Sequence, residues 1–262
     1  MAVKFFTGYS GYGGSTICLI DHCKLLDSCG FDVEFYGPND WHLKRYHKSY
    51  KSSEFKSNQE DIVIYHYVDL THRPSCSKCM IFLHETNLYD LRTKDISFFD
   101  EVLFASESQR EWHGFAGGVV VPNVMEDLVD VASHKPPNRN IAGVVGHVHP
   151  IKSTHISVLK ALEDGMERVH IYGPAYPPYF EEHIVPLLSD KVIYKGFYEP
   201  ENRMEIYNGF DVLYHFGEYE SACLVLGECR ILKKKVVKCD ALKDYPFCDK
   251  KQITQIWNQI LK

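Results

Sequence analysis

The feature that most constrains the fold of this chain is a regular alternation of short apolar segments with longer segments of helical periodicity. Apolar runs of about 4–8 residues predict buried strands, and the amphipathic runs of about 10–15 residues between them predict helices. Such alternation is typical of parallel β-sheets that are covered by helices. In the first half, strands are expected at Val3–Thr7, Asp32–Tyr36, Ile62–Tyr67, Met80–His84, Val102–Ala105 and Val119–Val121.

The alternation stops once and then restarts. Residues 125–140 lack an apolar period and contain Pro136 and Pro137, so a linker is expected there. Strands are expected again at Ile141–Val145, Val169–Tyr172, Val192–Tyr194, Val212–His215 and Val236–Lys238. Helices are expected after the first strand with a stop at Gly30, from Ser106 or Ser108, and at Ser153–Glu163, Glu201–Asn208, Ala222–Leu232 and Lys250–Leu261.

The pattern therefore predicts the α/β class, with two Rossmann-like doubly wound domains facing a central cleft. The first domain is expected at 1–125, the linker at 126–139 and the second domain at 140–249. Residues 250–262 are expected to form a C-terminal helix that packs back on the first domain. Because ligands of doubly wound sheets bind beyond the carboxyl ends of the strands, the cleft between the sheets is the expected site.

Composition excludes several classes of protein. The 262 residues are 45% apolar and 24% charged, which is typical of a soluble globular protein. No apolar run reaches the roughly 18 residues that span a bilayer, and the N-terminus lacks the apolar stretch of a signal peptide. The nine cysteines are odd in number and scattered, which favours reduced thiols and a cytoplasmic location.

Metal dependence is not predicted. Cys76 and Cys79 form a single Cys-x-x-Cys with His72 upstream, and no second matching pair completes four tetrahedral ligands. No Asp-x-Asp stands at the end of an expected strand, where it could hold a catalytic metal ion.

One basic segment departs from the overall net charge of −6, which itself argues against a protein coated in positive charge. Five cationic side chains stand against Glu54 alone between Trp41 and Lys56, which gives this segment a net charge of +4, and aromatic residues lie among them. The segment is either an ordinary solvated surface or a landing surface for a polyanion.

A glycine-rich loop, Gly8–Ser15, joins the first expected strand to the first helix. Gly13 and Gly14 stand where backbone N–H groups can approach a phosphate at a helix N-terminus. The spacing departs from the dinucleotide-binding G-x-G-x-x-G, and a plain tight turn explains the same glycines. Both interpretations remain open.

Two glutamates, Glu220 and Glu228, are separated by seven residues. Glu220 is expected in the loop after the strand Val212–His215, and Glu228 two turns into the next helix. The N-terminus of that helix is expected to present free N–H groups from Ser221 to Leu224. Carboxylates suit sugar hydroxyls, whose hydrogen bonds they accept. On spacing alone, one helix-terminal and one solvated glutamate explain the pattern as well.

In its order of motifs the chain resembles the retaining glycosyltransferases of family 4, which have the two-Rossmann GT-B fold and a Glu-x7-Glu signature. The segment Val145–Ser153 resembles the opening strand and phosphate loop of the second domain, with Lys152 at the phosphate-binding lysine. Further segments that resemble the family in order are Asp61–His66, Phe82–His84, Phe104–Ser106, Val121–Asn123, His170–Pro174, and Val192–Phe197 followed by Glu201, Tyr207 and Asp211.

The resemblance implies transfer of a hexose or pentose, with retention, from a nucleoside diphosphate sugar, with a UDP-sugar as the favoured donor and no other cofactor. It gives catalytic roles to Lys152 at the diphosphate, Glu220 at the sugar hydroxyls and His84 beside the reacting sugar. The other donor-binding positions that it implies are His147, Gly173, the amides of Ala222, Cys223 and Leu224, and Glu228 at the ribose. The family often has an arginine at His147, so that contact is missing, weaker or dependent on protonation.

The acceptor is expected on the first domain, at Lys44, Arg45, Lys48 and Lys51. Small glycosyltransferases of tailed phages, which modify hydroxymethylated DNA bases, are similar in size and charge pattern, so DNA in a host cytoplasm is the leading acceptor. A glycan or phospholipid precursor is the alternative acceptor. A non-catalytic nucleotide-sugar-binding module and an epimerase-like enzyme of the same fold are the rival functions.

Overall fold

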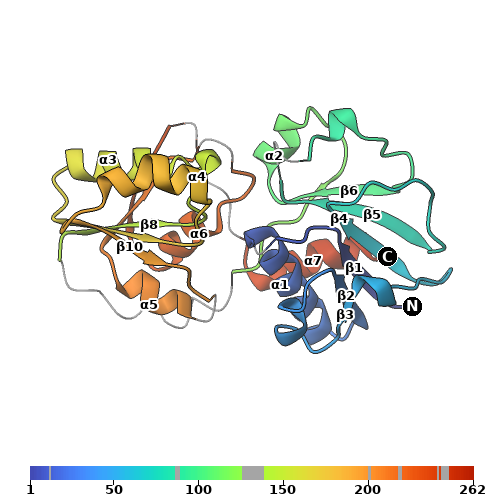
Figure 1. Ribbon diagram of the computed structural model, residues 1–262. Coiled ribbons are helices and arrows are strands. Elements are labelled where there is room, and N and C mark those ends of the chain that lie inside the picture. Colours follow the sequence, from blue (N-terminus) through green and yellow to red (C-terminus); the bar gives the residue numbers. More distant parts are fainter. Residues whose placement is uncertain are drawn as a thin grey trace. The chain divides into compact units, whose positions relative to one another are not determined.

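The computed structural model describes residues 1–11, 13–85, 89–125, 139–199, 202–217, 220–240, 242 and 248–262. The chain forms two compact units, which Figure 1 shows. The first unit contains Met1–Glu126 and Tyr245–Lys262, and the second contains Asp127–Asp244. Each unit is built on one parallel sheet, so the predicted class of two Rossmann-like α/β halves is confirmed. The linker expected at 126–139 lies outside the described residues, apart from Arg139.

The first unit has a seven-stranded sheet of order β3-β2-β1-β4-β5-β6-β7, in which every described pair is parallel. Its strands are β1 (Val3–Thr7), β2 (Val33–Gly37), β3 (Ser49–Lys51), β4 (Ile62–His66), β5 (Lys78–Leu83), β6 (Glu101–Phe104) and β7 (Val119–Val120). The strand order reverses between β1 and β4, and such a reversal opens a crevice at the carboxyl ends of the strands. Thr7 and His66 end these two strands.

The helices of the first unit are α1 (Gly14–Ser28), η1 (His42–Lys44), η2 (Ser52–Glu54), η3 (Leu91–Thr93), α2 (Glu107–Trp112) and α7 (Lys250–Ile260). Ser106 caps α2, as expected, because its hydroxyl accepts from the Gln109 N–H. The strand β3 was not predicted, because its three residues, Ser-Tyr-Lys, carry no apolar signal. The strands place Phe5, Phe35, Ile64 and Phe82 in a fully buried core.

The second unit has a five-stranded parallel sheet of order β10-β9-β8-β11-β12. Its strands are β8 (Ile141–Val145), β9 (Arg168–Tyr172), β10 (Val192–Gly196), β11 (Val212–His215) and β12 (Lys235–Lys238). Its helices are η5 (Pro150–Lys152), α3 (Thr154–Glu163), α4 (Pro177–Tyr179), η6 (Phe180–Ile184), η7 (Val185–Leu187), α5 (Arg203–Asn208) and α6 (Leu224–Ile231). No helix in the described parts of the chain is long and apolar enough to cross a membrane.

Two glycines allow the loops after β8 and β9 to pass closely. Gly146 and Gly173 have φ angles of 137° and 136°, a region that favours glycine. A Cβ atom on Gly173 would lie 1.9 Å from the carbonyl oxygen of Gly146, so no side chain fits there. Any larger residue at Gly173 would therefore push apart the two loops at the carboxyl edge of this sheet.

The last helix, α7, joins the first unit through one buried tryptophan. Asp249 caps the helix with a reciprocal bond from Gln252, which fixes where it begins. Trp257 is fully buried, and its ring N–H donates to His22 Nδ1 on α1 over 3.1 Å. Its ring also packs edge-on against Phe5 of β1, and Figure 1 shows α7 in red beside α1 in blue.

Replacing Trp257 with alanine is expected to lower the free energy of unfolding by about 3–5 kcal/mol, because the change leaves a cavity and removes the partner of His22. Chemical denaturation followed by circular dichroism measures the effect. Gln259→Ala, on the exposed face of the same helix, is the matched control and should shift stability by less than about 0.5 kcal/mol. Equal stability of the two variants would show that α7 is not anchored through Trp257.

Candidate functional site

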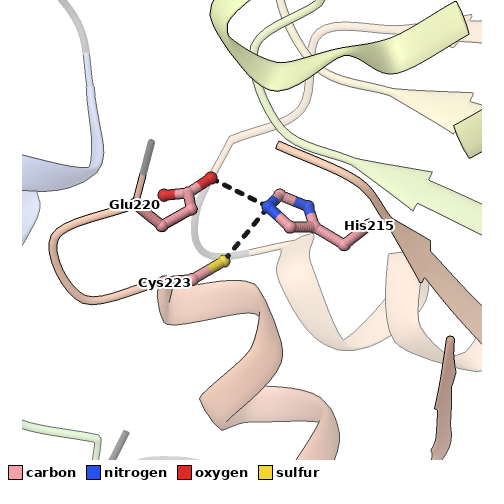
Figure 2. A group of neighbouring side chains, drawn as sticks. All are labelled: His215, Glu220 and Cys223. Atoms are coloured by element: carbon pink, nitrogen blue, oxygen red, sulfur yellow. Dashed lines mark hydrogen bonds and ion pairs between the residues drawn. The ribbon is translucent and has the colours of Figure 1, made fainter. Parts of the chain in front are cut away.

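A charged cluster gathers at the carboxyl end of β11 in the second unit. His215 is the last residue of β11, Glu220 follows in the loop, and Cys223 is the N-cap residue of α6 (Figure 2). His215 Nε2 lies 2.8 Å from Glu220 Oε1, and Lys152 Nζ lies 2.7 Å from the same oxygen. Cys223 Sγ lies 3.6 Å from His215 Nε2. One buried carboxylate oxygen therefore joins two basic side chains. We call these four residues the Glu220 cluster.

Close packing of two loops brings Lys152 to this cluster. A Cβ atom on Gly217 would lie 3.3 Å from Lys152 Cα, so the small residue lets the end of η5 approach the loop after β11. The Phe216 N–H donates to the Ser157 hydroxyl over 3.1 Å, which ties the same loop to α3. The backbone of Ser153, just after Lys152, is left-handed and turns the chain into α3.

Electrostatics keep the Glu220 cluster charged at neutral pH. Burial by itself raises the pKa of the Glu220 carboxyl, but Lys152 and His215 outweigh burial and hold that pKa at about 2. Burial lowers the pKa of His215, whereas Cys223 and Glu220 raise it, to about 10. Burial also lowers the pKa of Lys152, and Glu220 raises it above its ordinary value. Glu220 is thus an ionised acceptor of hydrogen bonds.

Lys152 is the member of the cluster that solvent reaches. Its side chain is 29% exposed, against 7% for Glu220 and 5% for His215. An anion from solution can therefore compete with Glu220 for the lysine ammonium without disturbing the His215–Glu220 pair. A phosphate, with more charge and more acceptor oxygens than one carboxylate oxygen, suits such an exchange.

The helix after the cluster begins later than expected. α6 starts at Leu224 instead of Ala222, and Cys223 occupies its N-cap position without a side-chain cap. The first-turn N–H groups therefore begin at Leu224, while Ala222 belongs to the preceding loop. The side chain of the N-cap residue Cys223 contacts His215, so α6 begins directly at the Glu220 cluster.

The loop after β8 carries two histidines. His147 is exposed, and its ring centroid lies 5.2 Å from that of half-buried His149, whose Nδ1 accepts from the Ile151 N–H. Burial, His149 and Lys152 all lower the pKa of His147. His147 is therefore a neutral imidazole at pH 7, which offers a neutral hydrogen bond where an arginine offers a charge.

Glu228 has different partners from Glu220. It lies on α6 with an 8% exposed surface, and its carboxylate accepts from the Tyr207 hydroxyl. Arg203 Nη1 lies 3.4 Å from Glu228 Oε1. Both partners come from α5, so α5 and α6 together orient this carboxylate. The sequence showed only the spacing between Glu220 and Glu228. It did not show their partners, because Tyr207 lies 21 positions from Glu228 and Lys152 lies 68 positions from Glu220.

A second polar cluster lies at the carboxyl ends of β1, β4 and β5 in the first unit. The Thr7 hydroxyl is 2.8 Å from His66 Nδ1, and His66 Nε2 is 3.1 Å from both carboxylate oxygens of Glu85. His84 lies beside it, with its ring centroid 5.7 Å from that of His66. The sequence analysis named His84 as a site residue and His66 only as the end of the segment Asp61–His66, and it missed Glu85, whose only signal is its position directly after His84.

Burial decides the protonation of this second cluster. Burial and, to a smaller extent, the neighbouring His66 lower the pKa of His84 to about 3. Burial raises the pKa of Glu85, but His66 outweighs burial and brings it to about 2. His84 is therefore neutral and Glu85 ionised across the physiological range, so His84 can accept or donate a hydrogen bond without carrying charge.

Acidic residues from elsewhere in the chain neutralise much of the basic segment. Lys48 Nζ lies 3.0 Å from Asp27 and 3.3 Å from Asp32, and Lys51 Nζ lies 3.1 Å from Asp40. Because these three aspartates precede Trp41, the net charge of +4 counted along Trp41–Lys56 overstates the local charge in three dimensions.

The other residues that were expected to contact anions are Lys44, Arg45, Gly13 and Gly14. Lys44 is exposed at the end of η1, and the Arg45 guanidinium lies 5.6 Å from the centroid of the Trp41 ring. Gly13 is the N-cap of α1, with extended backbone, and Gly14 begins the helix exposed to solvent. Gly13 has no side chain, so the N-cap residue of α1 cannot accept a hydrogen bond from the first-turn N–H groups.

Comparison with solved structures identifies the fold. The chain is similar to Anabaena Alr3699/HepE in complex with UDP and glucose, with a TM-score of 0.70 and 17% identity over 99% of this chain and 90% of that one. It is also similar to AviGT4, a glycosyltransferase involved in avilamycin A biosynthesis, with a TM-score of 0.66 and 14% identity over 98% and 88% of the two chains. The lipopolysaccharide outer core galactosyltransferase WaaB matches with a TM-score of 0.56 and 17% identity over 99% and 89%.

No protein-family model and no curated protein matches the sequence. At identities of 14–17%, the structural matches show that this chain has the GT-B glycosyltransferase fold.

The depressed pKa of His84 has a consequence for stability. In the unfolded chain His84 binds a proton as the pH falls through about 6.5, whereas in the folded protein it stays neutral down to about pH 3. The unfolded state therefore binds more protons in this window, and the contribution of His84 makes the folded protein less stable as the pH falls.

We therefore expect His84→Gln to flatten the loss of melting temperature between pH 7 and about pH 5 relative to the wild type. Thermal unfolding across this range measures it, and His72→Gln, which changes an exposed histidine, should keep the wild-type slope. Parallel curves for the wild type and His84→Gln would contradict the neutral, buried state of His84.

Proposed function

We propose that this chain is a glycosyltransferase that takes a sugar from a UDP-sugar held by the second unit and transfers it, with retention, to a hydroxyl group. The observation that carries the proposal is the Glu220 cluster: an ionised glutamate, a reachable lysine and a helix N-terminus meet at the carboxyl edge of a parallel sheet. The fold supports it, because similar structures include glycosyltransferases, one of them with UDP and glucose bound.

In this proposal Lys152 leaves Glu220 for the donor diphosphate. The leaving diphosphate gains negative charge as the glycosidic bond breaks, so a lysine and helix amides from Leu224 onward stabilise the transition state more than the ground state. The Glu220 carboxylate, still held by His215, then accepts hydrogen bonds from the sugar hydroxyls. We propose that Lys152 and these helix amides stabilise the diphosphate without a metal ion.

Glu228 is proposed to hold the ribose of the nucleotide. Tyr207 and Arg203 each contact one oxygen of the Glu228 carboxylate and so fix its orientation, and a carboxylate accepts hydrogen bonds from ribose hydroxyls. This arrangement gives Tyr207 and Arg203 positioning roles behind a nucleotide-binding glutamate. His84 is proposed to lie beside the reacting sugar as a neutral hydrogen-bonding group.

For the acceptor we propose a polyanion, with hydroxymethylated DNA as the leading case. Lys44 and Arg45 offer positive charge directly, while Lys48 and Lys51 would exchange Asp27, Asp32 and Asp40 for phosphates, as Lys152 does at the donor. These are surface ion pairs, which solvent screens and weakens, so the exchange costs little. A glycan or phospholipid precursor is the acceptor to test next if DNA is not used.

Glu228→Gln and Lys152→Ala should each weaken UDP binding, since each removes a hydrogen bond to a charged group worth about 1.5–3 kcal/mol, or about 10- to 150-fold in affinity. Isothermal titration with UDP measures the effect. Lys160→Ala, which removes a lysine paired with Glu163 and Asp164 on α3, is the control and should bind UDP as the wild type does. Wild-type affinity for UDP in both variants would show that Glu228 and Lys152 do not belong to the donor site.

The acceptor proposal is tested by changing Lys44, Arg45, Lys48 and Lys51 together to glutamine. Transfer to hydroxymethylated DNA should fall, and the slope of log affinity against log salt should become shallower by about 0.9 per lost phosphate contact. Hydrolysis of the donor by the same variant should be unchanged, which serves as the internal control. Transfer at the wild-type rate by this variant would show that the basic segment is ordinary solvated surface.

Two results would favour the rival functions. Binding of UDP-sugars with neither hydrolysis nor transfer would indicate a non-catalytic binding module. An altered sugar nucleotide produced without any acceptor would indicate an epimerase-like enzyme.

A further inference from the structure

Three side chains of the Glu220 cluster converge in a way that the proposed transfer does not require. His215, Glu220 and Cys223 each offer a potential metal-ligand atom, and these atoms all lie within 4.8 Å of one another. Figure 2 shows the carboxylate and the sulfur directed toward the same ring nitrogen of His215. In the described part of the chain, no other group of three or more histidine, cysteine or acidic side chains meets in this way.

The ligand chemistry is that of zinc. Thiolate sulfur, imidazole nitrogen and carboxylate oxygen are the three donors that Zn²⁺ uses in proteins, and three protein ligands with one open position is a common zinc arrangement. Calcium and magnesium prefer sites made of oxygen atoms alone, so the sulfur and nitrogen atoms argue against them.

Two of the three distances between ligand atoms are close to those of a tetrahedral ion, and the third, between Cys223 and Glu220, is within 4.8 Å. Zinc–sulfur and zinc–nitrogen bonds of about 2.3 and 2.05 Å at a tetrahedral angle separate the two ligand atoms by about 3.6 Å. The separation of Cys223 Sγ from His215 Nε2 is 3.6 Å. The nitrogen–oxygen separation in such a site is about 3.4 Å, compared with 2.8 Å between His215 and Glu220. A shift of Glu220 by about half an ångström closes this difference.

We propose that His215, Glu220 and Cys223 form a binding site for Zn²⁺, with the fourth position open to water or to an oxygen of a bound anion. The metal ion takes the place of the proton on His215 Nε2, and that proton and any proton on Cys223 Sγ pass to solvent.

Lys152 competes with the metal ion for Glu220. Its ammonium lies 2.7 Å from Glu220 Oε1 and would lie close to the dication, where like charges repel. The lysine is 29% exposed on a flexible stem, so it can turn away into solvent. Zinc therefore displaces Lys152 from Glu220 and occupies the carboxylate that the proposed transfer uses.

This competition makes zinc an inhibitor of the transfer and not its cofactor, a consequence that rests on the proposed function. Metal binding itself does not rest on it. The two ideas can therefore be tested separately, one by a spectroscopic titration without any sugar nucleotide and the other by donor turnover.

The experiment is a titration of the reduced full-length chain with Co²⁺, a spectroscopic substitute for zinc whose thiolate bond gives a charge-transfer absorption band. One equivalent of Co²⁺ should produce this band, and Zn²⁺ should abolish it by displacement. Cys223→Ser should lose the band and bind Zn²⁺ at least tenfold more weakly. The Cys76→Ser/Cys79→Ser double variant, which removes the separate Cys-x-x-Cys pair, should keep both.

Lys152→Gln tests directly whether the lysine competes with the metal ion. If the ammonium competes with the metal ion, this variant should bind Zn²⁺ more tightly than the wild type, whereas binding elsewhere would not respond. Far-ultraviolet circular dichroism checks that Cys223→Ser and Lys152→Gln are folded, and His215→Gln serves as a second ligand variant. The site is refuted by the absence of a thiolate band, by its persistence in Cys223→Ser, or by its loss in the Cys76/Cys79 variant. Inhibition of donor turnover by Zn²⁺ that persists in Cys223→Ser would refute the proposed competition alone.

Discussion

The sharing of one Glu220 oxygen between Lys152 and His215 is the interaction on which the rest of the second unit depends. A carboxylate with 7% exposure would be costly without compensation, and two basic partners supply that compensation. Only one of them, Lys152, is open to solvent. The cluster is therefore a buried pair with one partly exposed partner, and in our proposals this asymmetry lets an anion or a metal ion displace Lys152.

The two sheets each pair a histidine, at equivalent strand ends, with a glutamate that follows β5 in the first unit and β11 in the second. β4 and β11 are each the fourth strand of their sheet and lie next to its first strand, β1 or β8. Each ends in a buried histidine, His66 or His215, that pairs with a glutamate from a following loop. Among the described residues no lysine ion pair is recorded for Glu85, and a threonine hydroxyl occupies the other nitrogen of His66. The His66–Glu85 pair is buried, whereas the Glu220 cluster includes the partly exposed Lys152.

Strand periodicity predicted most of the fold because the central strands consist of apolar residues that are buried in the core. The polar edge strand β3 was missed, since its position is set by pairing with β2 and not by its residues. The late start of α6 at Leu224 could not be seen either, because Ser221 and Ala222 are compatible with a helix and only the loop geometry excludes them. For the site, the residues at strand ends were found, but their partners were not. Glu85 had no pattern around it, and the aspartates that neutralise Lys48 and Lys51 are distant in sequence.

The most direct test of the central claim is a crystal structure of the chain with UDP bound. The account expects the diphosphate at the carboxyl end of β11, with Lys152 Nζ within hydrogen-bond distance of a phosphate oxygen and no longer 2.7 Å from Glu220. It also expects the His215–Glu220 contact to remain. UDP bound away from α6, with the Lys152–Glu220 contact unchanged, would contradict the assignment of this cluster as the donor site.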